Sequence, residues 1–415
     1  MPRVLLLTTT RSYRAQDFVE AATRLGIEIV RGVDMPDELA GEWPGGFGLD
    51  FANSQSAIAT IRAHHQQRPF SAILASDDSG TILAALASAA LGLAHNSVSA
   101  AHAARDKYLM RQALANSGVN SPTFHLVQGQ PDLDAIITAV GFPAVVKPLA
   151  LNGSRGVIRV NDRLELQNAI ARITRLLHRV QGLPADQHPA LLVERYIPGD
   201  EVALEGLLHD GKLQLLTLFV KPDPLEGPYF EETIYVTPSR LDQHTQTAIT
   251  TATEAAARAL GLATGPLHAE LRLNGQGPWI VEVAGRSIGG LCSRVLQFGT
   301  AASLEELILA QAIGLPPRKV EPPDGARGVM MIPIPAAGLL RAVDGQQRAL
   351  RQKYITGLEI TAPLDNPLVP LPEGDGYLGF IFARGPSATA VEQALRTAHA
   401  ALTFRIDPLL TLEPL

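Results

Sequence analysis

Two apolar segments joined by a glycine-rich turn constrain the fold of this chain most. Residues 268–273 (HAELRL) and 279–283 (WIVEV) are expected to be strands, and Asn274-Gly275-Gln276-Gly277 between them is typical of a hairpin turn. Each strand carries one glutamate, Glu270 and Glu282. The hairpin therefore brings two carboxylates onto neighbouring antiparallel strands.

These two glutamates indicate a site for a divalent cation. A carboxylate without a partner is costly in an apolar strand, so we expect a positive charge close to each of them. Mg²⁺ is usually held by one or two protein carboxylates together with substrate phosphates. The alternative is a buried ion pair without a metal, with Arg286 as the partner, since it follows Glu282 by four residues.

The loop Arg286-Ser287-Ile288-Gly289-Gly290 follows the second strand and combines a guanidinium with a backbone of small residues. A guanidinium binds a carboxylate or a phosphate with two parallel hydrogen bonds. The sequence has no G-x-S-x-G motif, and Cys292 has no activating residue beside it. A covalent mechanism through serine or cysteine is therefore not indicated.

A candidate phosphate site follows the apolar run 144–147, which ends in Lys147. The next residues, Asn152-Gly153-Ser154-Arg155-Gly156, form a small-residue loop before a strand expected over 157–160. Small residues let backbone N–H groups approach phosphate oxygens, and the lysine adds a positive charge. The loop is not a Walker motif, and a plain hairpin with a glycine turn explains it equally well.

The segment 191–201 (LLVERYIPGDE) combines an apolar strand with a Pro-Gly turn. Backbone amides exposed after such a strand can pair with the edge of an adenine, and Glu201 can accept hydrogen bonds from ribose hydroxyls. Taken by itself, the segment is better explained as an ordinary strand and turn with surface acids.

The first ninety or so residues alternate between strand and helix patterns. Strands are expected over 3–7, 27–31 and 70–75, and a helix over 16–25 ends at Gly26. This order predicts a small parallel sheet with helices on its faces. No G-x-G-x-x-G follows the first strand, which argues against a dinucleotide-binding site.

The rest of the chain also alternates between strand and helix patterns. One helix is expected between Ser99, as its N-cap, and Gly118. Strands are expected within 202–220 and a helix over 248–260. Paired prolines predict a boundary at 315–325, followed by an α+β lobe.

Composition excludes several classes of partner. The formal net charge is −6 without a long basic run, so neither nucleic acid nor an anionic membrane is expected. Cys292 is the single cysteine, which excludes an intrachain disulfide and favours a cytoplasmic location. The longest apolar run, 81–94, is 14 residues long, whereas a membrane helix needs about 20. We therefore expect a soluble protein.

Taken in their order along the sequence, these features resemble the ATP-grasp superfamily over nearly the whole chain. The resemblance implies that Lys107, in Arg105-Asp106-Lys107, and Lys147 are the two lysines that contact ATP. It implies a phosphate-covering loop that contains Gly153, Ser154 and Gly156. The remaining implied roles are the adenine hinge (Glu194, Tyr196, Ile197), the ribose acid (Glu201), the metal acids (Glu270, Glu282) and the arginine that supports the transferred phosphoryl group (Arg286).

The resemblance implies a multi-lobe fold of α/β and α+β type. A Rossmann-like pre-ATP-grasp lobe is expected over 1–98, an ATP-grasp domain over 99–320 with a lid over about 124–197, and a C-terminal α+β lobe over 321–415. The chain departs from the family at Ala284, where many members have an asparagine that serves as a third metal ligand. The E-x-x-x-R spacing followed by Gly289-Gly290 is most similar to the L-amino acid ligase branch.

In that branch, the loop comparable to 221–235 (KPDPLEGPYFEETIY) lies near the substrates. Its acids Glu226, Glu231 and Glu232 repel one another, so they are either solvated or matched to a cation. The functional hypothesis is that Glu231 or Glu232 receives an ammonium group, with Gly289 and Gly290 also near the substrate. At least one substrate is then an amino acid or a related amine.

The implied activity is an ATP- and Mg²⁺-dependent ligase, with Mn²⁺ as a substitute metal, that joins a small-molecule carboxylate to an amine through an acyl phosphate. Lys147 and Arg286 are the implied catalytic residues. Two alternatives stay open: a bicarbonate-activating enzyme similar to biotin carboxylase or carbamoyl-phosphate synthase, and a non-catalytic ATP-binding module. The resemblance also implies a homodimer, whereas the identity of the acid and the amine is not encoded in any recognisable motif.

Overall fold

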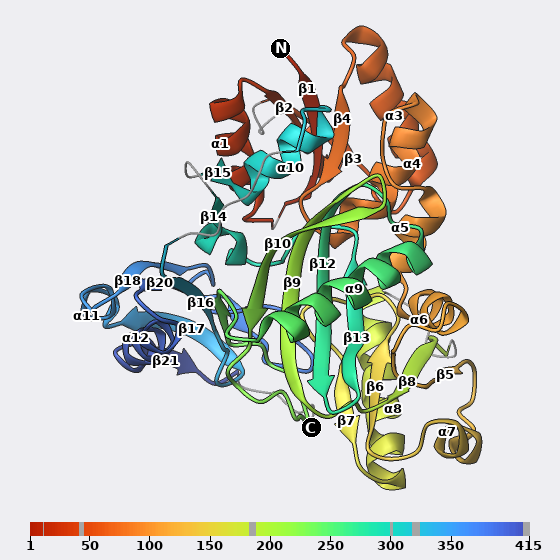
Figure 1. Cartoon of the computed structure of the whole chain (residues 1–415), viewed down its shortest axis with the longest axis vertical. Helices are drawn as coiled ribbons and strands as arrows, with labels where there is room; N and C mark the ends of the chain where they lie inside the picture. The colour runs from red at the N-terminus through yellow and green to blue at the C-terminus, as the bar shows by residue number, and fades with distance from the viewer. Residues whose placement is uncertain (11, 41–44, 182–187, 299–301, 318–323, 410–415) are drawn as a thin grey trace, which may run out of the picture.

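The computed structural model describes residues 1–415 except 11, 41–44, 182–187, 299–301, 318–323 and 410–415. Three lobes surround one long central sheet (Figure 1). Within the described ranges, no helix is both long enough and apolar enough to cross a membrane.

The N-terminal lobe is a parallel sheet with strand order β3-β2-β1-β4, covered by helices. The predicted alternation of strands and helices is confirmed, and Gly26 ends the first helix in the left-handed conformation (φ 66°). The elements are β1 (Arg3–Thr9), α1 (Ala15–Leu25), β2 (Glu28–Asp34), α2 (Asp37–Ala40), β3 (Gly46–Leu49), α3 (Ser54–Gln67), β4 (Ala72–Ala75), the 3-10 helix η1 (Asp78–Gly80) and α4 (Thr81–Leu91).

The single helix predicted between Ser99 and Gly118 is two helices, α5 (Val98–Arg105) and α6 (Lys107–Asn116). Asp106 separates them, because its backbone is extended and its carboxylate accepts two N–H groups of the first turn of α6. The N-cap of α5 is Ser97, whose hydroxyl accepts the N–H of Ala100, so the assignment of Ser99 was wrong.

The central sheet has eight strands in the order β13-β12-β9-β10-β11-β16-β20-β18. Its last three strands come from the segment expected to form a separate C-terminal lobe, so β-sheet pairing runs across the predicted boundary. The division at residue 320 stays a prediction. The strands are β9 (Asp200–His209), β10 (Lys212–Val220), β11 (Ile234–Thr237), β12 (Gly265–Asn274), β13 (Gly277–Ala284), β16 (Ala326–Ile332), β18 (Ile355–Ile360) and β20 (Gly379–Gly385), and α9 (Gln243–Leu260) packs on β13 and β10.

A separate antiparallel sheet, in the order β5-β8-β6-β7, forms the predicted lid with two helices. Its elements are β5 (Phe124–Val127), α7 (Leu133–Val140), β6 (Ala144–Pro148), β7 (Ile158–Val160), α8 (Arg163–Gln181) and β8 (Leu191–Arg195). The C-terminal lobe adds β17 (Gly338–Asp344), α11 (Gln346–Leu350), β19 (Pro367–Leu368), α12 (Ala388–Ala400) and β21 (Thr403–Asp407).

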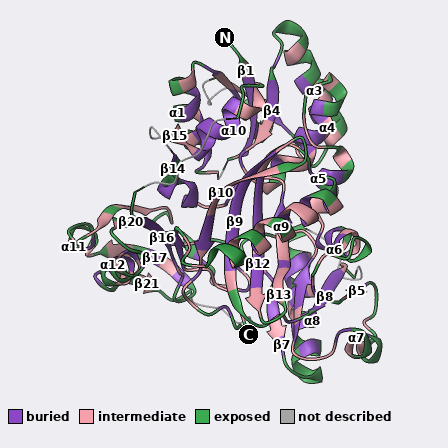
Figure 2. Cartoon of the chain, viewed as in Figure 1, coloured by how far each residue is buried: buried purple, intermediate pink, exposed green. Residues whose placement is uncertain are grey.

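The segment after the acidic hairpin returns to the N-terminal lobe. It contains η2 (Cys292–Val295), β14 (Gln297–Phe298), β15 (Ala302–Ser303) and α10 (Leu304–Ala312), and α10 packs against α1. Buried residues follow the central sheet along its length, whereas exposed residues cover the outer helices (Figure 2). The N-terminal lobe is thus fixed against one end of the central sheet, and a space is enclosed between this lobe and the sheet.

Candidate active site

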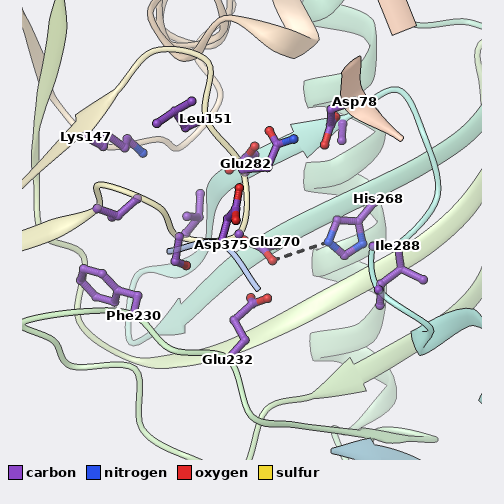
Figure 3. A pocket seen from close by; sticks show the side chains of 18 of the residues that line it. Asp78, Lys147, Leu151, Phe230, Glu232, His268, Glu270, Glu282, Ile288 and Asp375 are labelled. Atoms are coloured by element: carbon purple, nitrogen blue, oxygen red, sulfur yellow. Dashed lines mark ion pairs between the residues drawn. The ribbon is translucent and has the colours of Figure 1, made fainter. Parts of the chain in front are cut away.

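One cavity of about 450 Å³ lies between the lid, the N-terminal lobe and the central sheet. Lys147 and Leu151 of the lid lie on one side, His268 and Ile288 on the other, and Glu270 between them (Figure 3). Two predicted residues, Gly156 and Glu231, do not line the cavity. The predicted residues that line it are Lys107, Lys147, Gly153, Ser154, Glu194, Tyr196, Ile197, Glu201, Glu232, Glu270, Glu282, Arg286, Gly289 and Gly290.

The acidic hairpin has the expected register. Glu270 on β12 pairs directly with Glu282 on β13, and a bulge follows Glu270. Glu282 forms an ion pair with Lys107, whose Nζ lies 3.3 Å from Oε1. The cation expected next to Glu282 is therefore present, but it is Lys107 and not Arg286.

Lys221, at the end of β10, holds three carboxylates together. Its Nζ lies 2.6 Å from Glu201 Oε1 and 3.1 Å from Glu270 Oε1, and it also pairs with Glu232. Burial would lower the pKa of Lys221, but Glu201 and then Glu232 and Glu270 raise it well above its usual range. Lys221 was not predicted as a site residue, although a lysine directly after an apolar strand was the available signal.

This acidic cluster has the chemistry of a cation site. Glu201, Glu232 and Glu270 each offer a carboxylate oxygen, and these oxygens lie within 4.8 Å of one another. Oxygen donors of this kind fit Mg²⁺ or Mn²⁺. Glu282 is not part of this cluster, so the predicted pair of metal acids is divided between Lys221 and Lys107.

Glu232 is enclosed rather than solvated. Burial and then Glu270 raise its pKa to about 7, despite the attraction of Lys221. For Glu232, the solvated-loop interpretation was therefore wrong, whereas Glu226 is exposed and fits that interpretation.

Glu270 also faces a buried histidine that links it to the loop 286–290. His268 Nε2 lies 3.5 Å from Glu270 Oε1, and His268 Nδ1 pairs with Glu205. Glu205 is fully buried and accepts the N–H of Ile288 at 3.1 Å through its other oxygen. Burial would raise the pKa of Glu270, but Lys221 and His268 hold it well below the usual range. Glu205 was not predicted as a site residue, because its partners lie far away in the sequence.

The second predicted lysine has a buried carboxylate partner in the hinge segment. Lys147 Nζ lies 2.6 Å from Glu194 Oε2, and Arg111 lies 2.8 Å from the other oxygen of Glu194. Burial would raise the pKa of Glu194, but Arg111 and Lys147 lower it. Burial, despite Glu194, lowers the pKa of Lys147. Glu194 therefore fixes the lysine head at the cavity wall.

The hinge residues Tyr196 and Ile197 follow directly after β8. Two guanidinium groups lie near the Tyr196 ring, that of Arg159 at 4.2 Å and that of Arg272 at 5.3 Å from its centroid. Both oxygens of Glu201 are engaged, by Lys221 and by Arg272 at 3.0 Å. The ribose role of Glu201 stays a prediction.

The small-residue loop of the lid touches the C-terminal lobe. Gly153, Ser154 and Gly156 have φ values of 61°, 56° and 73°. The Gly156 N–H donates to Pro372 O at 2.8 Å, which explains why this residue faces away from the cavity. Arg155 and Arg172 bind Asp375 and Glu373 of the same C-terminal segment. The loop therefore bridges two lobes.

Arg286 reaches the N-terminal lobe. Its Nη2 lies 2.7 Å from Asp78 Oδ2, so the alternative that it pairs with Glu282 was wrong. Burial would raise the pKa of Asp78, but Arg286 lowers it to about 2. A charged arginine is thus fixed at the cavity wall beside Gly289 and Gly290.

Known protein families match most of the chain in three consecutive pieces. Residues 19–95 match an ATP-grasp N-terminal domain, 140–295 an ATP-grasp domain, and 330–407 an L-amino acid ligase C-terminal domain 2. The chain is 30% identical over 213 residues to an alanine--anticapsin ligase from Bacillus subtilis (strain 168), which is 48% of this chain and 44% of that protein. The chain thus matches less than half the length of this relative.

Solved structures share the fold. An L-amino acid ligase from Bacillus licheniformis superposes with a TM-score of 0.82 at 24% identity, over 98% of this chain and 99% of that one. The biotin carboxylase domain of a Hydrogenobacter thermophilus 2-oxoglutarate carboxylase, in complex with magnesium ADP and bicarbonate, gives a TM-score of 0.69 at 15% identity over 97% of this chain and 90% of that one.

Proposed function

Because the chain belongs to the ATP-grasp superfamily, we propose that it is an ATP-dependent ligase that joins the carboxylate of one small molecule to the amine of another. One observation carries the proposal: Lys107, Lys147 and Arg286 line the same cavity as the acids Glu270 and Glu282, beneath a loop of small residues. That arrangement has cations for phosphate oxygens and acids for a metal. The C-terminal match favours an amino acid as one substrate.

The proposed reaction has two steps. A carboxylate oxygen attacks the γ-phosphorus of ATP, the bond to the β,γ-bridging oxygen breaks, and ADP leaves. The amine nitrogen then attacks the carbonyl carbon of the acyl phosphate, phosphate leaves with the former carboxylate oxygen, and the nitrogen loses a proton as the amide forms. Phosphoryl transfer of this kind depends mainly on positioning and on neutralisation of charge.

The residues of the chain have separate tasks in this reaction. Lys107 and Lys147 bind phosphate oxygens, and Arg286 stabilises negative charge on the transferred group. Glu270 and Glu282, with Glu201 and Glu232 nearby, would hold Mg²⁺, which supplies neutralisation of the phosphates when bound. The loop with Gly153 and Ser154 excludes water, which would otherwise hydrolyse the acyl phosphate. Tyr196, Ile197 and Glu194 form the wall for the adenine.

The test is a screen for ADP release over amino acids, singly and in pairs, followed by isotope transfer. With an ¹⁸O-labelled carboxylate and the best amine, the label should appear in inorganic phosphate. Phosphate without label contradicts the acyl phosphate. ADP formation that requires bicarbonate instead favours the carboxylase alternative, and tight ATP binding without ADP formation across the panel favours a non-catalytic module.

A further inference from the structure

The cavity has an apolar end, which we call the aromatic end and define by Tyr13, Ile288, Cys292, Met331 and Tyr377. All five residues line the cavity. They come from the N-terminal lobe, the loop after the acidic hairpin and the C-terminal lobe. Ile288 lies on the opposite side of the acids from Lys147 (Figure 3), so this end is remote from the lysine that would bind phosphate.

Aromatic packing holds this end in shape. The rings of Tyr13 and Tyr377 both pack edge-on against Phe380, with centroid distances of 5.8 Å and 6.1 Å. Tyr13 nevertheless exposes 41% of its surface. An aromatic side chain that stays exposed while it lines a cavity is typical of a binding surface.

Gly290 keeps this end open. A Cβ atom at this position would lie 2.9 Å from a carbon of Phe380 and 3.5 Å from Cys292 Sγ, and the backbone has a φ of 61°. A side chain at Gly290 would thus collide with the ring behind the aromatic end. Arg286 and Ile288, a residue of the aromatic end, are two positions apart in this loop and both line the cavity.

The charged groups around this end already have partners among the described residues. Arg14 donates to Ser76 O at 2.8 Å and to Ser287 Oγ at 2.7 Å. The carboxylate of Asp77 accepts from Ser76 Oγ and from the N–H of Ser79.

Three further acids near this end are also paired, among them Glu232, which binds Lys221. Asp78 binds Arg286, and Asp375 binds Arg155 at 3.2 Å. A charged substrate side chain would therefore lose its hydration and would compete with these existing contacts for a counter-charge.

We infer that the aromatic end receives the side chain of the amino acid whose carboxylate is activated, and that this side chain is aromatic or long and aliphatic. The inference rests on the proposed function and adds a substrate class to it. A carboxylate at Arg286 leaves the side chain next to Gly290 and the two tyrosines. Apolar contact in such a pocket discriminates by about tenfold or more per missing methylene.

The test isolates the acid from the amine. The full chain is incubated with magnesium ATP, one amino acid and hydroxylamine, which captures the acyl phosphate as a hydroxamate. We expect kcat/KM for phenylalanine, leucine or methionine to exceed that for glycine, aspartate or lysine by about tenfold or more. Better turnover of glycine, aspartate or lysine would overturn the inference and leave the proposed function standing. No ADP or hydroxamate with any acid would contradict the proposed function itself.

Two variants of Tyr13 test whether the aromatic end determines the preference for an apolar side chain. Tyr13→Ala should lower the ratio of kcat/KM for phenylalanine to that for glycine about tenfold, whereas Tyr13→Phe, which keeps the ring, should leave this ratio unchanged. Leu350→Ala, which truncates an exposed side chain on α11, is the control for a generic loss of apolar surface. An unchanged ratio in Tyr13→Ala, or a preference that appears only for the amine, would overturn the assignment.

Discussion

Glu270 and Glu282 are direct cross-strand partners, yet their carboxylates are bound by different cations: Lys221 and His268 surround Glu270, and Lys107 binds Glu282. Each acid is thus neutralised from a different element. A metal that bridges the two must compete with lysines for both, which links metal binding to a rearrangement of ammonium groups at the cavity wall.

The acid pair provides the first prediction. Glu270→Gln and Glu282→Gln should each fold and lose nearly all ADP release, because each removes one negative charge from a proposed Mg²⁺ ligand. The measurement is ADP release at saturating amino acid, with circular dichroism to verify folding. Glu226→Gln, an exposed acid in the loop before Glu232, is the matched control and should retain full activity. A folded Glu282→Gln enzyme with a normal rate would contradict the assignment.

Lys221 provides the second prediction. Lys221→Met leaves Glu201, Glu232 and Glu270 without their shared cation, and removal of one partner of a buried ion pair costs about 3–5 kcal/mol of unfolding free energy. Mg²⁺ should restore more stability to this variant than to the parent chain, because it replaces the lost charge.

Urea unfolding with and without Mg²⁺ measures both effects. Lys212→Met, at the exposed start of the same strand, is the control. An equal response of the parent and Lys221→Met to Mg²⁺ would show that the three carboxylates do not bind the metal.

The lid contacts provide the third prediction. Arg172 binds both oxygens of Glu373, at 2.6 Å and 2.9 Å, and Arg155 binds Asp375, so the C-terminal segment holds the lid without any ligand. Glu373→Ala should therefore speed amide hydrogen exchange over residues 150–158 in the absence of nucleotide, and an ATP analogue should restore protection.

Asp134→Asn removes an ion pair with Arg163 on the outer face of the lid and serves as the control. Equal exchange over 150–158 in the parent chain and in Glu373→Ala would show that the contact between Arg172 and Glu373 does not hold the lid.

The Asp78–Arg286 pair predicts a pH dependence. The pKa of Asp78 falls from 3.8 to about 2 on folding, so its contribution to stability is fully present above pH 4 and disappears as the pH falls through 2. The contribution is about 2 kcal/mol. The difference in unfolding free energy between the parent chain and Asp78→Asn should thus shrink as the pH is lowered from 6 to 3. A constant difference over this range would contradict the ion pair.

Local patterns predicted most of the scaffold. Alternating strands and helices over the first ninety residues and the hairpin at 274–277 depend on neighbouring residues, and both are confirmed. The break at Asp106 was missed because a helical pattern continues across it, and only the side-chain cap reveals the interruption. The pairing of β11 with β16 was also unpredictable, since it joins strands separated by a helix, a hairpin and an entire return to the N-terminal lobe.

The residues of the candidate site also differ in whether a local sequence pattern identifies them. Residues with a recognisable spacing, such as Lys147 and Arg286, were found from the sequence and line the cavity. Residues that act through distant partners were not found: Glu205 lies in an apolar strand and Lys221 directly follows one, and neither position specifies its partners. Burial of a charge is tolerated only when partners exist, and those partners are defined by the tertiary fold.

Glu205 provides the last prediction. Its two oxygens hold His268 and the N–H of Ile288, so it connects the acid Glu270 to the loop that carries Arg286. In Glu205→Gln, one side-chain atom becomes an N–H₂ donor, which cannot accept from either partner. The loop should therefore shift, and a displacement of about 1 Å at a reacting group can lower kcat about 10²-fold. We expect kcat to fall by this factor with little change in the Kd of an ATP analogue, and hydrogen exchange at 286–290 to increase. Glu254→Gln is the matched control, because Glu254 also accepts a backbone N–H, that of Leu213 at 3.2 Å, and does not line the cavity. If both variants keep the parent kcat and the parent exchange at 286–290, Glu205 does not position the loop.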